Sequence, residues 1–362
     1  MLKEGIAFDG LHYNISKLDS YNKKWNFCWS PRELGKTTAI DVQKIYKLYK
    51  ENGWPSVILF NMAADMTEAQ VLSMENTINK FKGREVHLRV KKDCGTIWVI
   101  YDDSGSESRI FCIYASVGAP IRRLKGLNLG PIGCIVYDEF MVNTKVGEKY
   151  PTELAFRIKE IYKTFVRECR PRLLRIYCMG NPYSRYHPLF VALKVNINDI
   201  QKGKTLVGDN YVIDAAVLSE ELKKSILEND PSHEFDDPYE RYAFEGDAIN
   251  DDEINIAEKQ PENYRLKTVF KVNDRYLWVY KGDVELLELI HYARYWMRTS
   301  SEKPGKRQDI ICVDFSSLVQ NGALASLYKG YFDNLKANIA ANQVLYESPE
   351  AYYLAQLVYQ VI

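Results

Sequence analysis

The sequence contains no apolar run near the roughly 20 residues that a membrane-spanning helix needs, so we expect no membrane contact. Lys and Arg together number 48, and so do Asp and Glu, which gives a formal net charge of zero. A neutral chain has no overall attraction to nucleic acid, so any binding of a polyanion has to come from local patches. The first ten residues carry acids and no apolar stretch, so we expect no secretory signal there.

Cysteine and histidine are too few and too scattered to predict a metal centre. The seven cysteines contain no C-x-x-C pair, and the chain has only five histidines. Zinc sites use closely spaced Cys and His ligands, so we expect none here. An odd number of cysteines, several of them inside apolar stretches, is typical of reduced, buried thiols in an intracellular protein.

The length of 362 residues predicts two or three domains, and an apolar fraction of 46% with 27% charged residues is ordinary for a globular protein. Charge is uneven along the chain. Residues 157–175 carry seven bases and two acids, whereas residues 228–262 carry 13 acids and two bases. We interpret the acidic stretch as a solvated linker and divide the chain into a core domain (1–182), a lid and linker (183–265) and a second domain (266–362).

Short apolar stretches alternate with helical patterns in the first half of the chain, which indicates βαβ units and a mostly parallel sheet. The expected strands are 25–29, 56–60, 86–90, 96–102, 109–116, 133–140 and 173–182, and the expected helices are 39–52, 64–81 and 152–168. The second half is expected to contain helices at 219–228 and 237–245, a hairpin at 268–282, strands at 285–290 and 309–315, and two amphipathic helices after 322.

A phosphate-binding loop is predicted where the first strand meets the first helix. The loop consists of Ser30, Pro31, Arg32, Glu33, Leu34, Gly35, Lys36, Thr37 and Thr38. Its first position is Ser30, where G-x-x-x-x-G-K-[ST] has glycine, but the strand–loop–helix context is the one that cradles phosphates on backbone N–H groups. Lys36 would neutralise the β- and γ-phosphates of ATP, and the Thr37 hydroxyl would coordinate Mg²⁺.

Two later strands end in polar residues suited to the same site. The strand CIVYDEF ends in Asp138 and Glu139, which would hold Mg²⁺ and polarise the attacking water. The alternative is a strand that merely ends in two solvated acids. The strand RIYCMGN ends in Asn181, which would sense the γ-phosphate or serve only as a turn former before Pro182.

Several arginines complete the candidate set. Arg32 lies inside the loop, where a guanidinium would contact phosphate. Arg167 and Arg170 precede the Asn181 strand, where a ring-forming ATPase could offer one of them to its neighbour as an arginine finger. The alternative for each arginine is a surface position or a salt bridge. Spacing does not decide whether Arg167 or Arg170 is the finger. The basic run 122–125 would contact DNA phosphates or form a solvated turn.

The order of these motifs resembles the terminase-type large-subunit ATPases of tailed phages, and most of all the small DNA-encapsidation ATPases of phi29-like podoviruses. The resemblance rests on the loop with its internal arginine, the strand IVYDEF (135–140) and the strand ending in Asn181. The segments RYAFEGDAINDDE (241–253) and 329–358 are similar in character to the linker and C-terminal segment of that group.

The resemblance implies an α/β P-loop NTPase core of the ASCE or RecA-like type, followed by a lid and linker and a small RNase H-like domain. It implies a homo-oligomeric ring, a pentamer, that sits transiently on the portal of a viral prohead in the host cytoplasm. The ring would translocate double-stranded DNA with ATP and Mg²⁺. By carry-over, Lys36 and Thr37 match Walker A, Asp138 and Glu139 match Walker B, and Asn181 matches the coupling residue. Arg32 matches the loop arginine, and Arg167 or Arg170 the finger.

The C-terminal domain departs from the large terminases, which carry a two-metal nuclease there. Tyr280 and Lys281 stand where a catalytic acid is expected, and Asp283 and Asp314 alone make a poor two-metal site. We therefore predict a nuclease-like domain without nuclease activity. The alternatives are a terminase with an active nuclease, another P-loop translocase or helicase, and a ring component that binds nucleotide without turnover.

Overall fold

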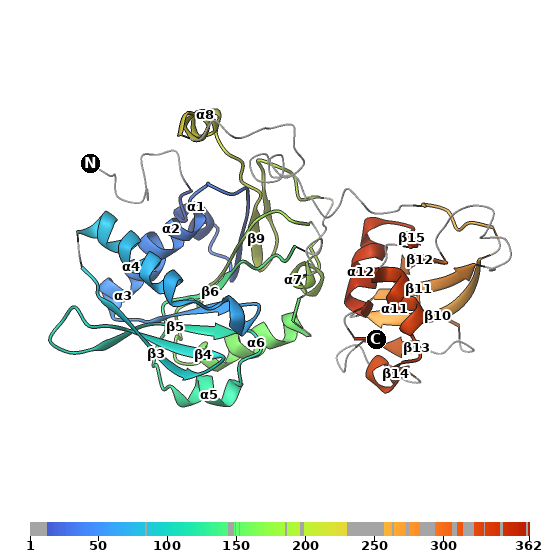
Figure 1. Cartoon of the computed structure of the whole chain (residues 1–362), viewed down its shortest axis with the longest axis horizontal. Coiled ribbons are helices and arrows are strands. Elements are labelled where there is room, and N and C mark those ends of the chain that lie inside the picture. Colours follow the sequence, from blue (N-terminus) through green and yellow to red (C-terminus); the bar gives the residue numbers. More distant parts are fainter. Residues whose placement is uncertain are drawn as a thin grey trace. The chain divides into compact units, whose positions relative to one another are not determined.

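The computed structural model of the chain divides into two compact units, Met1–Arg185 with Leu193–Ile249 and Tyr186–Ala192 with Asn250–Ile362 (Figure 1). Each unit is described by itself. The structure describes residues 13–362 apart from 84, 144–147, 149, 152, 185–186, 196–198, 230–256, 263, 273–274, 283–293, 306–309, 314–321, 329, 341–342 and 360.

Within the described residues of the first unit, one sheet has the strand order β3-β4-β5-β2-β6-β7-β1-β9-β8. The six strands from β5 to β9 in this order are parallel, and the antiparallel strands β3, β4 and β8 lie at the edges. This confirms the predicted α/β fold with a parallel-sheet core. The strands are β1 (Trp25–Trp29), β2 (Ser56–Phe60), β3 (Leu88–Cys94), β4 (Ile97–Asp102), β5 (Arg109–Ser116), β6 (Ile135–Asp138), β7 (Ile176–Gly180), β8 (Thr205–Val207) and β9 (Tyr211–Asp214).

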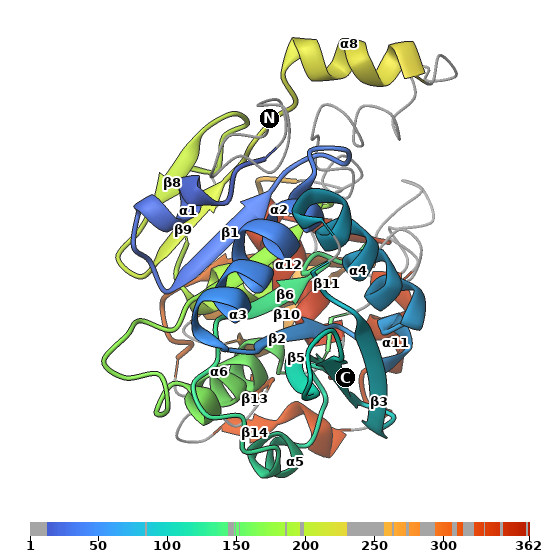
Figure 2. The same cartoon turned by 90° about the vertical axis from the view of Figure 1, so that its left-hand side faces the viewer.

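Helices cover both faces of this sheet, which explains why every residue of β1, β2 and β7 is buried. The crossovers from β1 to β2 and from β5 to β7 run in opposite directions across the sheet, so right-handed connections place their helices on opposite faces (Figures 1 and 2). One face carries the continuous helix α2 (Lys36–Ile40), η1 (Asp41–Tyr46) and α3 (Lys47–Asn52), together with α4 (Glu68–Lys82). The other carries α5 (Ile121–Gly126) and α6 (Leu154–Phe165).

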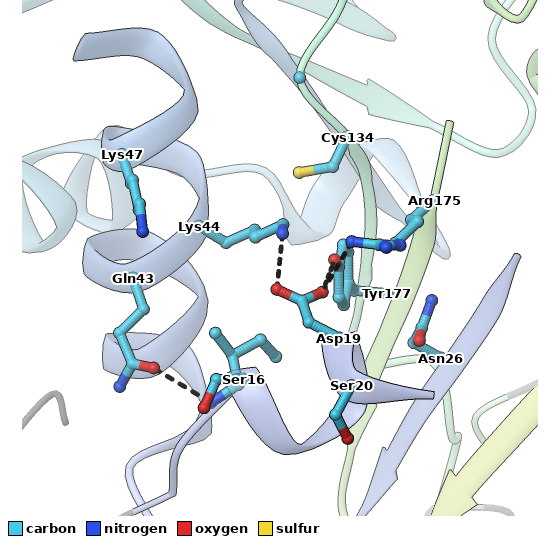
Figure 3. A network of polar contacts seen from close by, with 12 residues as sticks. Ser16, Asp19, Ser20, Asn26, Gln43, Lys44, Lys47, Cys134, Arg175 and Tyr177 are labelled. Atoms are coloured by element: carbon cyan, nitrogen blue, oxygen red, sulfur yellow. Dashed lines mark hydrogen bonds and ion pairs between the residues drawn. The ribbon is translucent and has the colours of Figure 1, made fainter. Parts of the chain in front are cut away.

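The short helix α1 (Ser16–Ser20) fastens the helix after β1 to the sheet (Figure 3). Asp19 accepts hydrogen bonds from Lys44 at 2.7 Å and from Arg175 at 3.3 Å, and the Tyr177 hydroxyl donates to the same carboxylate. Just before α1, the Tyr13 N–H donates to the Leu34 carbonyl at 2.8 Å. The segment 13–20 therefore holds both the loop after β1 and the helix that follows it.

The second unit contains a six-stranded sheet in the order β14-β13-β10-β11-β12-β15 within the described residues. Strands β10, β11 and β12 are antiparallel, and β13 and β14 are added parallel beside β10, which is the arrangement of an RNase H-like sheet. The strands are β10 (Tyr264–Val272), β11 (Arg275–Gly282), β12 (Tyr295–Ser300), β13 (Ile310–Cys312), β14 (Gly322–Leu324) and β15 (Val344–Tyr346). The helices are α7 (Pro188–Ala192), α11 (Asp333–Ala340) and α12 (Pro349–Tyr359).

Several sequence predictions gain detail from these elements. The hairpin at 268–282 is present as β10 and β11, but the segment after 322 contains β14 and β15 in addition to its two helices. Residues 205–214, inside the stretch predicted as lid and linker, form β8 and β9 and extend the sheet of the first unit, and α8 (Glu220–Asn229) follows. None of the helices in the described part of the chain has the length and apolar character to span a bilayer.

Some predictions fall on residues outside the described part of the chain. These are the acids Asp283 and Asp314, the helix at 237–245 and the strand at 285–290. The absence of nuclease activity accordingly stays a prediction.

Candidate nucleotide-binding site

The loop after β1 has the backbone that a phosphate cradle requires. Strand β1 lies between β7 and β9 and is buried throughout, so its carboxyl end is fixed. Glu33 and Gly35 adopt left-handed backbone conformations, with φ of 59° and 75°. Gly35 is also the residue before the first turn of α2, where glycine accepts a positive φ without strain. The chain thus reverses sharply and points the N-terminus of α2 toward the carboxyl edge of the sheet.

Lys36 folds back over this loop and links it to β7. Its ammonium donates hydrogen bonds to the Ser30 carbonyl at 2.9 Å, the Pro31 carbonyl at 2.6 Å and the Asn181 Oδ1 at 3.0 Å. Three acceptors match the three N–H donors of an ammonium, so the group is fully satisfied. Burial lowers the pKa of Lys36, while the nearby carboxylates of Glu139 and Asp138 act in the opposite direction. The ammonium of Lys36 is thus held in position by three neutral oxygens, and the charges of Asp138 and Glu139 act on it.

Asp138 and Glu139 stand at the carboxyl end of β6, between β2 and β7. Burial and the neighbouring charge of Glu139 raise the pKa of Asp138 to about 7, and Lys36 opposes this. Loss of hydration also raises the pKa of the Glu139 carboxyl, against the effect of Lys36 and Arg32. Two carboxyls whose ionisation depends on a nearby cation are typical of a site that binds charged ligands.

The backbone at Glu139 is held in a strained conformation. Its φ of 47° is left-handed, which is unfavourable for a residue with a side chain. The Asn61 side chain donates to the Glu139 carbonyl at 2.9 Å, and the Tyr137 hydroxyl donates to Asn61 in turn. The Glu139 N–H donates to Asp138 Oδ1 at 3.1 Å. These bonds hold the backbone of Glu139 at the point where the buried strand ends.

Gly180, the last residue of β7, lets the chain after Glu139 pass close by. A Cβ at this position would lie 2.7 Å from Cδ1 of the Phe140 ring, which is fully buried. We expect Gly180→Ala to lower the free energy of unfolding by about 1–3 kcal/mol, because the ring must move in a packed core. Denaturant unfolding measures this. The control is Gly118→Ala, whose new Cβ would meet its nearest atom at 3.8 Å. Equal stability of the two variants would contradict the close contact.

Asn181 and Arg32 occupy different environments. Asn181 is 6% exposed and directs its side-chain oxygen to Lys36, so it is in contact with the loop as well as forming a turn with Tyr183. Arg32 lies on the exposed side of the loop, and its guanidinium donates to the Tyr183 hydroxyl at 3.3 Å. Both residues connect the loop after β1 with the segment after β7.

Arg167 and Arg170 lie away from this group. Both come before β7 begins, whereas Asn181 follows its end, and five residues of strand span about 16 Å. Arg167 lines a cavity of about 530 Å³ between α5 and α6, together with Lys125 and Lys163. Arg170 does not line it. In the basic run 122–125, Arg123 pairs with Asp93 at 3.4 Å.

The residues at the carboxyl edge suit a Mg²⁺–nucleotide. Thr37 is exposed in the first turn of α2, Asp138 supplies a carboxylate oxygen, and oxygen is the ligand Mg²⁺ prefers. In the described part of the chain no three His, Cys, Asp or Glu side chains form a metal-binding group. A Mg²⁺ would therefore take its other ligands from phosphates and water, as it does in ATPases.

Sequence reasoning overlooked four residues that shape this site. Asn61 positions the backbone of Glu139, Tyr183 contacts Arg32, and Tyr13 bonds to the loop at Leu34. Asp41 is an acid buried on the helix after the loop. Only Asp41 carried a signal in the sequence, as a charged residue between the apolar positions Ile40 and Val42.

The nine-stranded sheet, the loop after β1 and the acids after β6 define a P-loop ATPase fold. No family model matches the sequence, and no curated protein matches it. Solved structures do. The Phi-28 gp11 DNA packaging motor matches with a TM-score of 0.63 and 14% identity, covering 96% of this chain and 97% of that one. The bacteriophage Phi-29 viral genome packaging motor assembly matches with a TM-score of 0.57 and 17% identity, covering 96% and 100%. The chain therefore shares the fold of phage packaging motors over nearly its whole length.

Proposed function

We propose that this protein is an ATPase subunit of a ring that moves double-stranded DNA into a viral prohead. The observation that carries the proposal is the contact of Lys36 with Asn181 beside the acids Asp138 and Glu139, at the carboxyl edge of a sheet with the fold of packaging motors. Both structural neighbours are described as packaging motors, which supports DNA and the prohead as partners. The place of action is then the host cytoplasm.

Each residue of the site has a task in ATP hydrolysis. The loop 30–38 binds the phosphates on its N–H groups, and Lys36 neutralises their charge. Thr37 and Asp138 would hold Mg²⁺, which would supply positive charge against the phosphates. Glu139 orients and polarises the attacking water. Asn181, bonded to Lys36, transmits the state of the phosphates to β7 and, through Tyr183 and Arg32, to the outside of the loop.

The arginine finger comes from a neighbouring subunit in this proposal. Arg167 and Arg170 are separated from the site of their own chain by the length of β7, so either would act on the next subunit. Arg167 is favoured because it shares a concave surface with Lys125 and Lys163, and these three bases outnumber the two acids of that surface, Glu160 and Glu168. A homo-oligomeric ring, a pentamer by the resemblance to phi29-like motors, places every site at such an interface.

The competing functions differ in what they require. A nucleotide-binding ring component without turnover has no use for an acid at Glu139, whose strained backbone is held by the Asn61 side chain and, through it, by Tyr137. A helicase would need a second motor domain, whereas the second unit has an RNase H-like sheet. The second unit then serves contact with DNA or the portal, without nuclease activity.

Steady-state ATP hydrolysis tests the proposal. We expect the purified chain to hydrolyse ATP with Mg²⁺, and expect double-stranded DNA to raise the rate, most strongly once empty proheads are added to assemble the ring. Affinity for DNA should fall steeply as salt rises, because phosphate contacts release counterions. Absence of turnover even with proheads and DNA would leave the nucleotide-binding ring component as the better reading.

A further inference from the structure

Tyr13 has no task in the proposed mechanism, although it contacts the phosphate-binding loop directly. Its N–H donates a hydrogen bond to the Leu34 carbonyl at 2.8 Å. Leu34 is buried and lies between Glu33 and Gly35, the two residues of the loop with left-handed backbone conformations. The carbonyl that Tyr13 holds therefore belongs to the peptide that joins the loop to the first turn of α2.

This bond sets the direction of the Gly35 N–H. A trans peptide is planar, so its carbonyl and its N–H point in opposite directions. The Leu34 carbonyl is turned toward the buried Tyr13, so the Gly35 N–H is turned away from it. The Gly35 carbonyl accepts from the Ala39 N–H at 2.9 Å, which makes Gly35 the start of the continuous helix 36–52. Its N–H is thus one of the donors that a helix leaves unpaired at its N-terminus, and such donors bind phosphate.

The Tyr13 side chain is fixed to the sheet. Its hydroxyl donates to Asp214 Oδ2 at 3.1 Å, and both residues are buried. Asp214 ends β9 and lies opposite Cys28 of β1, two residues before the loop begins. Burial and the charges of Cys28 and Asp214 raise the pKa of Tyr13, so its hydroxyl stays protonated and remains a donor.

The partners of Tyr13 are themselves held in place. Lys17 of α1 donates to Asp214 Oδ1 at 2.7 Å, and the Thr205 hydroxyl of β8 donates to the same oxygen at 2.9 Å. The Gln43 side chain, from the helix after the loop, donates to the Tyr13 carbonyl at 3.4 Å. Tyr13 is therefore bonded to the hairpin β8–β9, to the loop and to the helix that follows the loop, so its position is defined from three directions.

We propose that Tyr13 is a positioning residue for the phosphates of ATP, which orients the Leu34–Gly35 peptide so that the Gly35 N–H faces them. This inference rests on the proposed function. The bond to Asp214 fixes the side chain of Tyr13, the side chain fixes its main chain, and the main-chain N–H fixes the loop. A donor that is already oriented binds its ligand more tightly, because no ordering of the loop has to accompany binding.

Tyr13→Phe tests this role, because it removes the hydroxyl and keeps the ring in the core. We expect the affinity for a fluorescent ATP analogue to fall about fivefold or more, since a hydrogen bond to a charged phosphate is worth roughly tenfold in affinity. The affinity for inorganic triphosphate, measured by competition with the analogue, should fall by the same factor. Turnover at saturating ATP should stay within about twofold, as Lys36, Asp138 and Glu139 are unchanged.

Tyr49→Phe is the matched control. The Tyr49 hydroxyl donates to another buried carboxylate, Asp102 Oδ2, at the same distance of 3.1 Å, but Tyr49 lies on α3, away from the loop. Both variants should lower the melting temperature by a similar few degrees. Only Tyr13→Phe should weaken the binding of the ATP analogue and of triphosphate. If the two variants bind both probes equally well, the role of Tyr13 is structural and the inference is wrong.

Thr205→Val provides a second variant should Tyr13→Phe fail to fold, because it removes one donor to Asp214 and leaves Tyr13 whole. It should weaken triphosphate binding about twofold or more, and unchanged binding would contradict the inference. Weaker binding of the ATP analogue with unchanged binding of triphosphate would also overturn it, since Tyr13 would then act on the adenosine part. If the wild-type protein binds neither probe, the proposed function itself fails, and the two failures are thereby distinguished.

Discussion

Glu139→Gln is expected to lower DNA-stimulated ATP turnover by about 10³-fold or more while affinity for ATP stays within about twofold. The substitution keeps the shape of the side chain and its left-handed backbone, so the hydrogen bond from Asn61 to the Glu139 carbonyl remains. It removes the negative charge that polarises the attacking water. Lys36 keeps its acceptors, so the phosphates still find the same loop. Turnover and equilibrium binding of a labelled nucleotide measure the two effects separately.

Glu68→Gln is the control for this change, because Glu68 is an exposed acid on α4, outside the site, and pairs with Lys92 of β3. Its turnover should match the wild type. Asp138→Asn should behave differently from both, with a loss of the Mg²⁺-dependent part of nucleotide affinity as well as of turnover. If Glu139→Gln hydrolyses ATP at the wild-type rate, Glu139 has no role in the mechanism. The alternative interpretation, a strand that merely ends in two solvated acids, would then be correct.

The parts of the site that the sequence predicts are the local ones. The strand, loop and helix around Lys36 lie within a single βα unit, and the acids after β6 follow a continuous apolar run, so pattern and spacing suffice. Position along the chain cannot show that Lys36 reaches Asn181, because that bond joins residues 145 positions apart. The strained backbone at Glu139 also cannot be predicted from the sequence, since it depends on Asn61, a residue 78 positions earlier that follows β2.

The elements that sequence reasoning missed are short or atypical in pattern. Strands β14 and β15 have three residues each, too few for an alternating pattern to differ from a helical one. Strand β8 lies at the edge of the sheet, where burial is partial, and β9 beside it is buried but has only four residues. Asp41 was overlooked for a related reason. Its neighbours Ile40 and Val42 fit a buried helix face, and a single acid among them is easily taken for a solvent-facing residue.

The cavity between α5 and α6 helps to decide whether Arg167 or Arg170 is the candidate arginine finger, which spacing in the sequence does not decide. Both arginines follow α6, but only Arg167 lines the cavity that Lys125 and Lys163 share. Arg170 comes directly before Pro171 and lies near Tyr162. Burial and Cys169 raise the pKa of the Tyr162 hydroxyl, and the charge of Arg170 lowers it. The cavity is lined by three bases and by two acids, Glu160 and Glu168, so its small positive excess favours Arg167 over Arg170 for contact with the phosphates of an adjacent subunit.

Arg167→Ala is therefore expected to lower ATP turnover of the prohead-bound ring by about 10³-fold or more, the usual effect of losing an arginine finger. Arg170→Ala should change turnover by less than about threefold and serves as the matched control. Mixing Arg167→Ala with Glu139→Gln subunits tests the direction of the contact. An Arg167→Ala subunit keeps its Glu139, and a Glu139→Gln neighbour supplies an intact Arg167, so the interface between them is competent. In a random ring made from equal amounts of both variants, about a quarter of the interfaces have this arrangement. Single-turnover hydrolysis in the mixture should exceed that of either variant alone. A mixture as inactive as its parts would mean that Arg167 does not act across the interface.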